Sequence, residues 1–468
     1  MRSPLLLLTL GLLACRRDAR PTPRRAPAAD VARAADPRPA ARRPSAHDRR
    51  IAEIDDRVRG HERMAAARAD NWLDLEHAAI LYLQRARLSG DYDDYGRAED
   101  ALTRAFQRAP DGAGPLLTRA NFNYAVHRVL RVEEDLARVE RWVIVSAPQR
   151  EAIASLRADV AYHSGRYPEA RRMYLDLLAQ RRSVSRVVAL AQLEWKTNHF
   201  DRATTLLDEA QRLAEEEPVE SRAWLRMVRG MMETDRGRLD DALARFRDAL
   251  RLRPGSWALE EHVAEVLAWL GRHEEARLMY ADLVARTGDP EFMDQLADLE
   301  ARRGQTARAA ALVREARAVY DRRAARFPEA TAGHAIAFFL KHDPPRALEL
   351  ATLDRAARPG GEAQVRYARA LTRNGRYADA RAVVDATLLT EWNTAELHAI
   401  ASVVYAQLGD AARAASERAA ALAIDPHAMD DADDDLPDAR DAGATARSSR
   451  RRPAPRSPAP AGAGAAPA

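Results

Sequence analysis

GMMETDRGRLDDALARFRDALRLRP, residues 230–254, has the pattern of two short helices joined by a tight turn. Small residues at Gly230 and Ala242 allow the two helices to approach each other closely. Gly237 permits the tight turn between them, because glycine adopts backbone conformations that other residues avoid. Pro254 ends the second helix because it has no backbone N–H to donate. We therefore expect an antiparallel helical pair in this stretch.

The turn of this pair recurs along the chain as a six-residue unit that ends in alanine. The closing alanines lie 33 to 39 residues apart, which indicates an internal repeat. The units are GRYPEA (165–170), NHFDRA (198–203), GRLDDA (237–242), GRHEEA (271–276), GQTARA (304–309), HDPPRA (342–347), GRYADA (375–380) and GDAARA (409–414). The residues expected to hold the repeats together are Ala170, Ala203, Gly237, Ala242, Phe246, Pro254, Gly271, Ala276, Ala309, Ala347, Gly375, Ala380, Gly409 and Ala414.

A helix-turn-helix unit with this spacing resembles the tetratricopeptide repeat, whose period is about 34 residues. The resemblance implies an all-α fold, a right-handed superhelical α-solenoid in which the first helix of each pair lines a concave groove. Over residues 51–427 it implies nine or ten helical pairs. Upstream of the regular units, AEDALTRAFQRAP (98–110) matches the second half of a further repeat.

The chain begins with a short apolar run, LLLLTLGLLAC (5–15), that ends at its only cysteine. The run is too short to span a bilayer, which takes about 20 apolar residues. Leu12 to Cys15 resembles the lipobox of bacterial lipoprotein signal peptides, which implies removal of residues 1–14 and attachment of lipid to Cys15. Arg16 stands where an aspartate would favour inner-membrane retention, so the resemblance favours the outer membrane, facing the periplasm. A plain secretory signal is the alternative.

Two segments contain few large apolar residues and cannot bury enough surface to offset the entropy of ordering. Residues 15–50 are rich in proline, alanine and arginine, and we expect a disordered tether there. Residues 428–468 begin with an acidic cluster and continue as a basic, proline-rich stretch, which we expect to be a disordered tail. The acidic cluster lacks the glycine and the closing carboxylate of a calcium loop.

No pattern of catalytic residues occurs in the sequence, and the chain is predicted to be neither an enzyme nor a cofactor binder. His262 with Glu261 and Glu265 comes nearest to a metal cluster. Acidic neighbours on a helix are typical of a solvated face, so no metal is predicted. The formal net charge of +4 gives no field that favours nucleic acid, and no nucleic-acid binding is predicted.

The surface of the groove remains as the place for a partner. By the register of the tetratricopeptide repeat, the positions that would contact a protein or peptide are Tyr162, His163, Trp195, Lys196, Met227, Met231, Asp235, Glu261, Glu265 and Trp269. Aromatic residues recur among them, and aromatic anchors commonly dominate peptide recognition. The alternative is that these rings fill space against a neighbouring helix.

These features together predict a non-enzymatic, lipid-anchored scaffold that binds a protein or peptide partner at the bacterial cell envelope. Two other functions remain open at this point. The chain is alternatively a regulatory subunit of an envelope enzyme, for instance in peptidoglycan remodelling. The second alternative is a cytosolic adaptor, in which case the leading leucines would come from a misassigned start codon.

Overall fold

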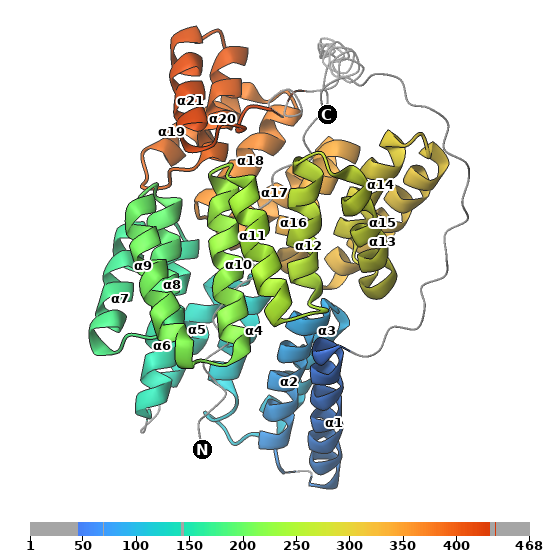
Figure 1. Cartoon of the computed structure of the whole chain (residues 1–468). Coiled ribbons are helices and arrows are strands. Elements are labelled where there is room, and N and C mark those ends of the chain that lie inside the picture. Colours follow the sequence, from blue (N-terminus) through green and yellow to red (C-terminus); the bar gives the residue numbers. More distant parts are fainter. Residues whose placement is uncertain (1–44, 69, 142–144, 431–435, 437–468) are drawn as a thin grey trace, which may run out of the picture.

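The computed structural model describes residues 45–68, 70–141, 145–430 and 436, and within them every regular element is a helix. The predicted all-α solenoid is confirmed: ten antiparallel helical pairs follow a leading helix α1 in these residues (Figure 1). The bounds are α1 Ala46–Ala67, α2 Leu73–Ser89, α3 Asp93–Arg108, α4 Leu116–Ala125, α5 Val129–Val139, α6 Ala147–His163, α7 Tyr167–Gln180, α8 Val184–Lys196, α9 Phe200–Leu213, α10 Val219–Asp235, α11 Leu239–Leu252, α12 Trp257–Trp269, α13 His273–Thr287, α14 Pro290–Arg302, α15 Thr306–Arg326, α16 Pro328–His342, α17 Pro344–Ala357, α18 Gly361–Arg373, α19 Tyr377–Leu388, α20 Ala395–Gln407 and α21 Ala411–Ile424, with a 3-10 turn at Ala214–Glu216.

The recurring six-residue unit forms the turn inside each pair. Gly237, between α10 and α11, has a φ of 68°, in the left-handed region that favours glycine. In the divergent unit NHFDRA, Asn198 adopts the same conformation with a φ of 63°, which asparagine tolerates better than most residues. The alanines that close these units, such as Ala203 and Ala242, are fully buried where the second helix crosses the first.

The first helix begins earlier than the sequence predicted. α1 begins at Ala46, inside the segment 15–50 that was expected to be a disordered tether. Ser45 caps the helix: its hydroxyl accepts from the Asp48 N–H, and the Asp48 carboxylate accepts from the Ser45 N–H. Ile54 and Val58 are buried with residues of α2 in one apolar cluster. The boundary predicted at residue 51 is therefore wrong by part of a helix.

Residues 1–44 lie outside the described part of the chain, as does most of the segment 428–468. The signal peptide, the lipid on Cys15 and the disorder of both segments therefore stay predictions. Among the described helices, none is both long enough and apolar enough to cross a bilayer.

The solenoid winds back onto itself, which the repeat pattern did not predict. Phe327, between α15 and α16, makes edge contacts with the rings of Tyr95 and Phe122 in the first two pairs. The backbone N–H of Asn393, between α19 and α20, donates to the carbonyl of Lys196 at 3.0 Å. We call these contacts, made by loops of the second half on residues of the first half, the seam. Figure 1 shows α19–α21, in red-orange, above the green helices α8 and α9.

The hydrophobic core continues across the seam. A single apolar cluster contains Tyr162 and Val187 from the first half together with Leu397 and Tyr405 from the second. Consecutive pairs of a solenoid normally contact only their neighbours. Here, residues far apart in the sequence share one core, and this arrangement positions the sites described below.

Candidate functional site

The structure places most of the predicted partner-binding residues inside the molecule. The side chain of Trp195 is 2% exposed and lies in the main core, while Met231 is also buried and Met227 and Trp269 are partly buried. Trp195 is therefore a core residue that packs against neighbouring helices, which is the alternative given above for these rings. Replacing it with alanine is expected to lower the melting temperature, because a large core cavity would result.

Two charged members of the predicted set neutralise each other. The Lys196 ammonium donates to the Asp235 carboxylate, and both side chains are at least nine-tenths buried. The ammonium also lies 4.6 Å from the centroid of the Trp195 ring. These groups link α8 to α10 instead of facing an open groove.

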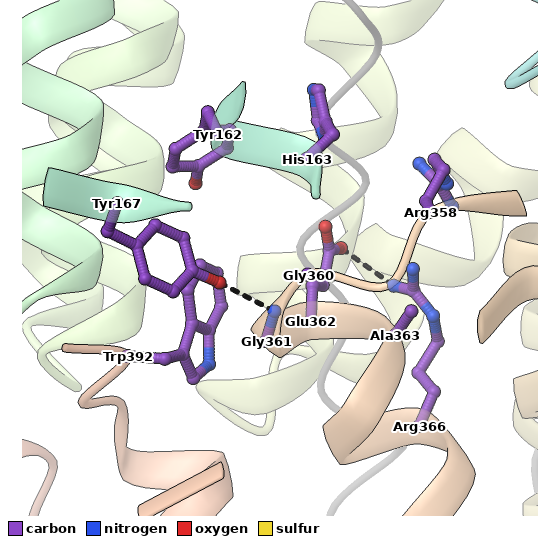
Figure 2. Close-up of a pocket in the computed structure, with 10 residues that line it drawn as sticks. All are labelled: Tyr162, His163, Tyr167, Arg358, Gly360, Gly361, Glu362, Ala363, Arg366 and Trp392. Atoms are coloured by element: carbon purple, nitrogen blue, oxygen red, sulfur yellow. Dashed lines mark hydrogen bonds and ion pairs between the residues drawn. The ribbon is translucent and has the colours of Figure 1, made fainter. Parts of the chain in front are cut away.

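Tyr162 and His163 lie at the end of α6, where the seam closes over them (Figure 2). The Gly360 N–H donates to the His163 carbonyl at 2.8 Å, and the Gly361 N–H donates to the Tyr167 hydroxyl at 2.6 Å. Trp392 stacks on Tyr167, with ring centroids 5.7 Å apart. The space around these residues is about 250 Å³, part of it continuous with solvent. The register of the repeat therefore located a real contact surface, and its occupant is the chain itself.

Only glycine fits at the two backbone positions that meet at this point of the seam. A Cβ on Gly360 would lie 2.8 Å from the carbonyl oxygen of His163. A Cβ on Gly361 would lie 2.1 Å from the indole ring of Trp392. Both distances are shorter than real contacts allow. At Gly360 the two halves therefore approach as closely as their backbones permit, while Gly361 leaves room for the Trp392 ring within the second half.

Three charged residues, Arg358, Glu362 and Arg366, line the same space, and the buried Asp354 of α17 pairs with both arginines. Asp354 accepts hydrogen bonds from Arg358, at 2.7 Å, and from Arg366, at 2.9 Å. Arg366 also donates to Glu362 at 2.7 Å. Burial alone would raise the pKa of Glu362, but the guanidinium groups of Arg366 and Arg358 outweigh burial and lower the pKa to about 2. Two cations and two anions balance here, which makes the pocket a structural junction.

Buried histidines lie beside this junction. The Tyr124 hydroxyl lies 3.1 Å from Nε2 of His163, and the ring of His127 stacks on that of His334. Burial, reinforced by the nearby Arg358, lowers the pKa of His163 to about 4 and the pKa of His127 well below its usual value. Both imidazoles are therefore neutral at pH 7.

The acidic group on α12 is not a solvated face, contrary to the prediction. The side chains of Glu261, His262 and Glu265 are only 10 to 13% exposed. The His262 ring stacks on Phe246 of α11, with ring centroids 4.8 Å apart. The prediction was wrong because it rested on the acidic neighbours alone, which do not reveal that the His262 ring packs on the adjacent helix α11.

An open cleft lies between α3, α4 and α5, on residues that sequence reasoning did not select. Its volume is about 1170 Å³, part of it continuous with solvent. Leu102, Phe106 and Phe122 supply its apolar lining. The Arg119 guanidinium lies over the Phe106 ring, 4.2 Å from its centroid, and pairs with Asp135. Phe122 is buried, so the aromatic surface of the cleft that remains accessible is that of the half-buried Phe106.

Charged groups at the edge of the cleft remain available. Arg131 and Glu134 are exposed on α5, and neither forms an ion pair within the described residues. A loop containing Gly112 and Gly114, both with left-handed φ, separates α3 from α4 and keeps the first two pairs apart. The only sequence signal for this gap was the glycine-rich interruption DGAG (111–114) after Pro110.

Comparison with known proteins places part of the chain in a repeat family. Residues 233–299 match the family model of the tetratricopeptide repeat. The match supports a tetratricopeptide-repeat protein, and the predicted resemblance is confirmed for these residues. No curated protein sequence matches the chain.

Solved structures share helical architecture with the chain at low similarity. Yeast Tom70 is 15% identical over 86% of this chain and 94% of its own, with a TM-score of 0.31. A tetratricopeptide repeat protein from Parabacteroides merdae is 16% identical over 52% of this chain and 93% of its own, with a TM-score of 0.32. A human IFIT1 dimer with m7Gppp-AAAA is 13% identical over 75% of this chain and 94% of its own, with a TM-score of 0.37.

Proposed function

We propose that the chain is a non-enzymatic, lipid-anchored scaffold at the bacterial cell envelope, and that it binds a peptide segment of a protein partner in the cleft between α3 and α5. One observation carries the proposal: the cleft is open and lined by aromatic rings, whereas the inner positions predicted from the repeat register are occupied by the chain itself. The tetratricopeptide match supports a role in protein interaction.

The chemistry of the cleft favours a peptide with an apolar anchor beside an acidic residue. The half-buried Phe106 offers ring surface to the anchor, and large aromatic contacts carry much of the binding energy in protein interfaces. Arg131, at the edge, would pair with the acidic residue. Lipid on Cys15 would hold the scaffold at the membrane and raise the effective concentration of membrane partners.

Site-specific crosslinking tests the cleft. A photoreactive residue in place of Gln107, which lines the cleft, is expected to crosslink one partner protein in intact cells. The same residue in place of Arg245, exposed on α11, serves as the matched control. Adding Arg131→Glu is expected to lower the yield at position 107 by about fivefold, the effect of losing about 1 kcal/mol of ion pairing. Equal yields at both positions, or no response to Arg131→Glu, would count against the cleft.

Metabolic labelling with palmitate tests the anchor. The parent chain is expected to incorporate the label and to sediment with membranes, while Cys15→Ala is expected to do neither. Label in both chains, or in neither, would contradict lipid attachment at Cys15. The crosslinking result does not depend on this outcome, so the two parts of the proposal can fail separately.

A further inference from the structure

We propose that Glu261, His262 and Glu265 on α12 bind a divalent transition-metal cation of the zinc class. The proposal is independent of peptide binding in the cleft, which is formed by other helices. Its three potential ligands come from one turn of one helix, because residues three and four apart share a face.

The ligand atoms are spaced as such an ion requires. One atom from each of the three side chains lies within 4.8 Å of the other two. The His262 Nδ1 lies 3.1 Å from a Glu261 carboxylate oxygen and 3.9 Å from a Glu265 carboxylate oxygen. With metal bonds of roughly 2.1 Å, two ligands of a tetrahedral zinc ion lie roughly 3.4 Å apart. The two distances bracket this value, so small side-chain movements would complete three corners of a tetrahedron.

Burial makes a bound cation favourable at this position. The Glu265 side chain is 10% exposed, and its one ionic contact within the described residues is the His262 ring. Two carboxylates held together with little access to water repel each other, and each loses hydration. A divalent cation bound between them would offset this repulsion.

The ligand atoms, and the stacking that holds the His262 ring, indicate the type of metal. One imidazole nitrogen with two carboxylate oxygens suits zinc and its first-row neighbours better than magnesium or calcium, which take oxygen ligands only. The His262 ring stacks on the Phe246 ring, with 17° between the ring planes, and this contact fixes its orientation. A histidine ring fixed in this way keeps Nδ1 turned toward the carboxylates without a rearrangement on binding.

The full chain carrying Cys15→Ala, treated with a chelator, allows a direct test, because the substitution removes the one competing thiol. Titration with Co²⁺, followed by visible absorption, and competition with Zn²⁺ are expected to show one ion per chain. Zn²⁺ is also expected to raise the melting temperature. Glu265→Gln and His262→Ala are each expected to weaken binding more than about tenfold.

His398→Ala is the matched control, because His398 is equally buried but pairs with the single carboxylate of Glu417. It is expected to leave metal affinity unchanged. Circular dichroism establishes that each variant folds, and Glu265→Gln preserves the shape of the side chain. Metal affinity that is absent, or equal in the parent and in both α12 variants, would overturn the proposal.

Discussion

Asp159 on α6 is a carboxyl group that the fold has removed from water. Tyr174 donates a hydrogen bond to one of its oxygens at 2.8 Å, and the other oxygen is buried without a hydrogen-bond partner in the described residues. Burial raises the pKa of Asp159 to about 7, against the opposing effect of the Tyr174 hydrogen bond. The folded chain therefore holds a proton there that the unfolded chain releases near pH 4.

This difference makes the contribution of Asp159 to stability depend on pH. Because the folded pKa is the higher one, the contribution is complete below about pH 4 and is lost as the pH rises to about 7. The free energy of unfolding of the parent, minus that of Asp159→Asn, is expected to fall by about 4 kcal/mol across this window. Urea unfolding at several pH values measures it. A difference that stays constant would contradict a buried, protonated Asp159.

The comparison with Asp159→Asn is necessary because His163 contributes with the opposite sign. Its folded pKa of about 4 lies below the ordinary value, so its contribution is present above about pH 6.5 and is lost toward pH 4. Both variants of the comparison contain His163, and subtraction removes its effect.

Within a helical pair, close approach depends on which residues lack a side chain. Gly230 on α10 lies against Phe246 on α11, and a Cβ at Gly230 would lie 2.5 Å from the ring. Gly60 on α1 is also inside a helix, but a Cβ there would meet nothing within 4 Å. The two glycines share a helical backbone and differ only in what surrounds them.

Alanine at these two positions is expected to have opposite effects. Gly230→Ala is expected to destabilise the protein by about 1 to 3 kcal/mol, because overpacking outweighs the gain in helix propensity. Gly60→Ala is expected to stabilise it by up to about 1 kcal/mol. Thermal and urea unfolding measure both. Combining Gly230→Ala with Phe246→Leu should recover part of the loss, and no recovery would show that the clash with Phe246 is not its cause.

At the scale of the whole molecule, the seam joins the last helical pairs of the array to its first half. Arrays in which each unit contacts only its neighbours unfold in segments, with stability that sums over local terms. Here the loops at Gly360 and Trp392 connect the last pairs directly to α6 and α7. We therefore expect the C-terminal pairs to gain stability from helices far away in the sequence.

Gly361→Ala tests this coupling, because the added Cβ would collide with the Trp392 ring. Helix content by circular dichroism is expected to stay close to that of the parent, while hydrogen exchange in α18–α21 becomes at least about tenfold faster. Solution scattering is expected to show a larger radius of gyration. Gly60→Ala is the control that adds a methyl group away from the seam. Unchanged exchange and dimensions in Gly361→Ala would show that the seam does not hold the halves together.

The sequence alone predicted those structural features that depend on residues close together in the chain. Gly237 and its counterparts specify turns, and the buried alanines such as Ala242 specify close crossings, because both requirements are satisfied within one repeat. The repeat period therefore predicted helical pairs and an all-α solenoid. The α1 boundary failed because Ser45 and Asp48 form a cap next to a proline-rich stretch that resembles a tether.

Only the tertiary structure revealed the seam, the buried acidic group on α12 and the open cleft. The seam arises from the small rotation between successive pairs, which accumulates over many repeats and is set by packing that no single repeat contains. That rotation brings Gly360 against the backbone of His163. The cleft lies where the loop with Gly112 and Gly114 separates α3 from α4, and the acidic group packs against the neighbouring helix α11. Tertiary packing also buries Trp195 and Glu265 and leaves Phe106 accessible. A repeat register specifies which face of a helix turns inward, but the winding of the whole array determines whether that face meets a partner or the chain itself.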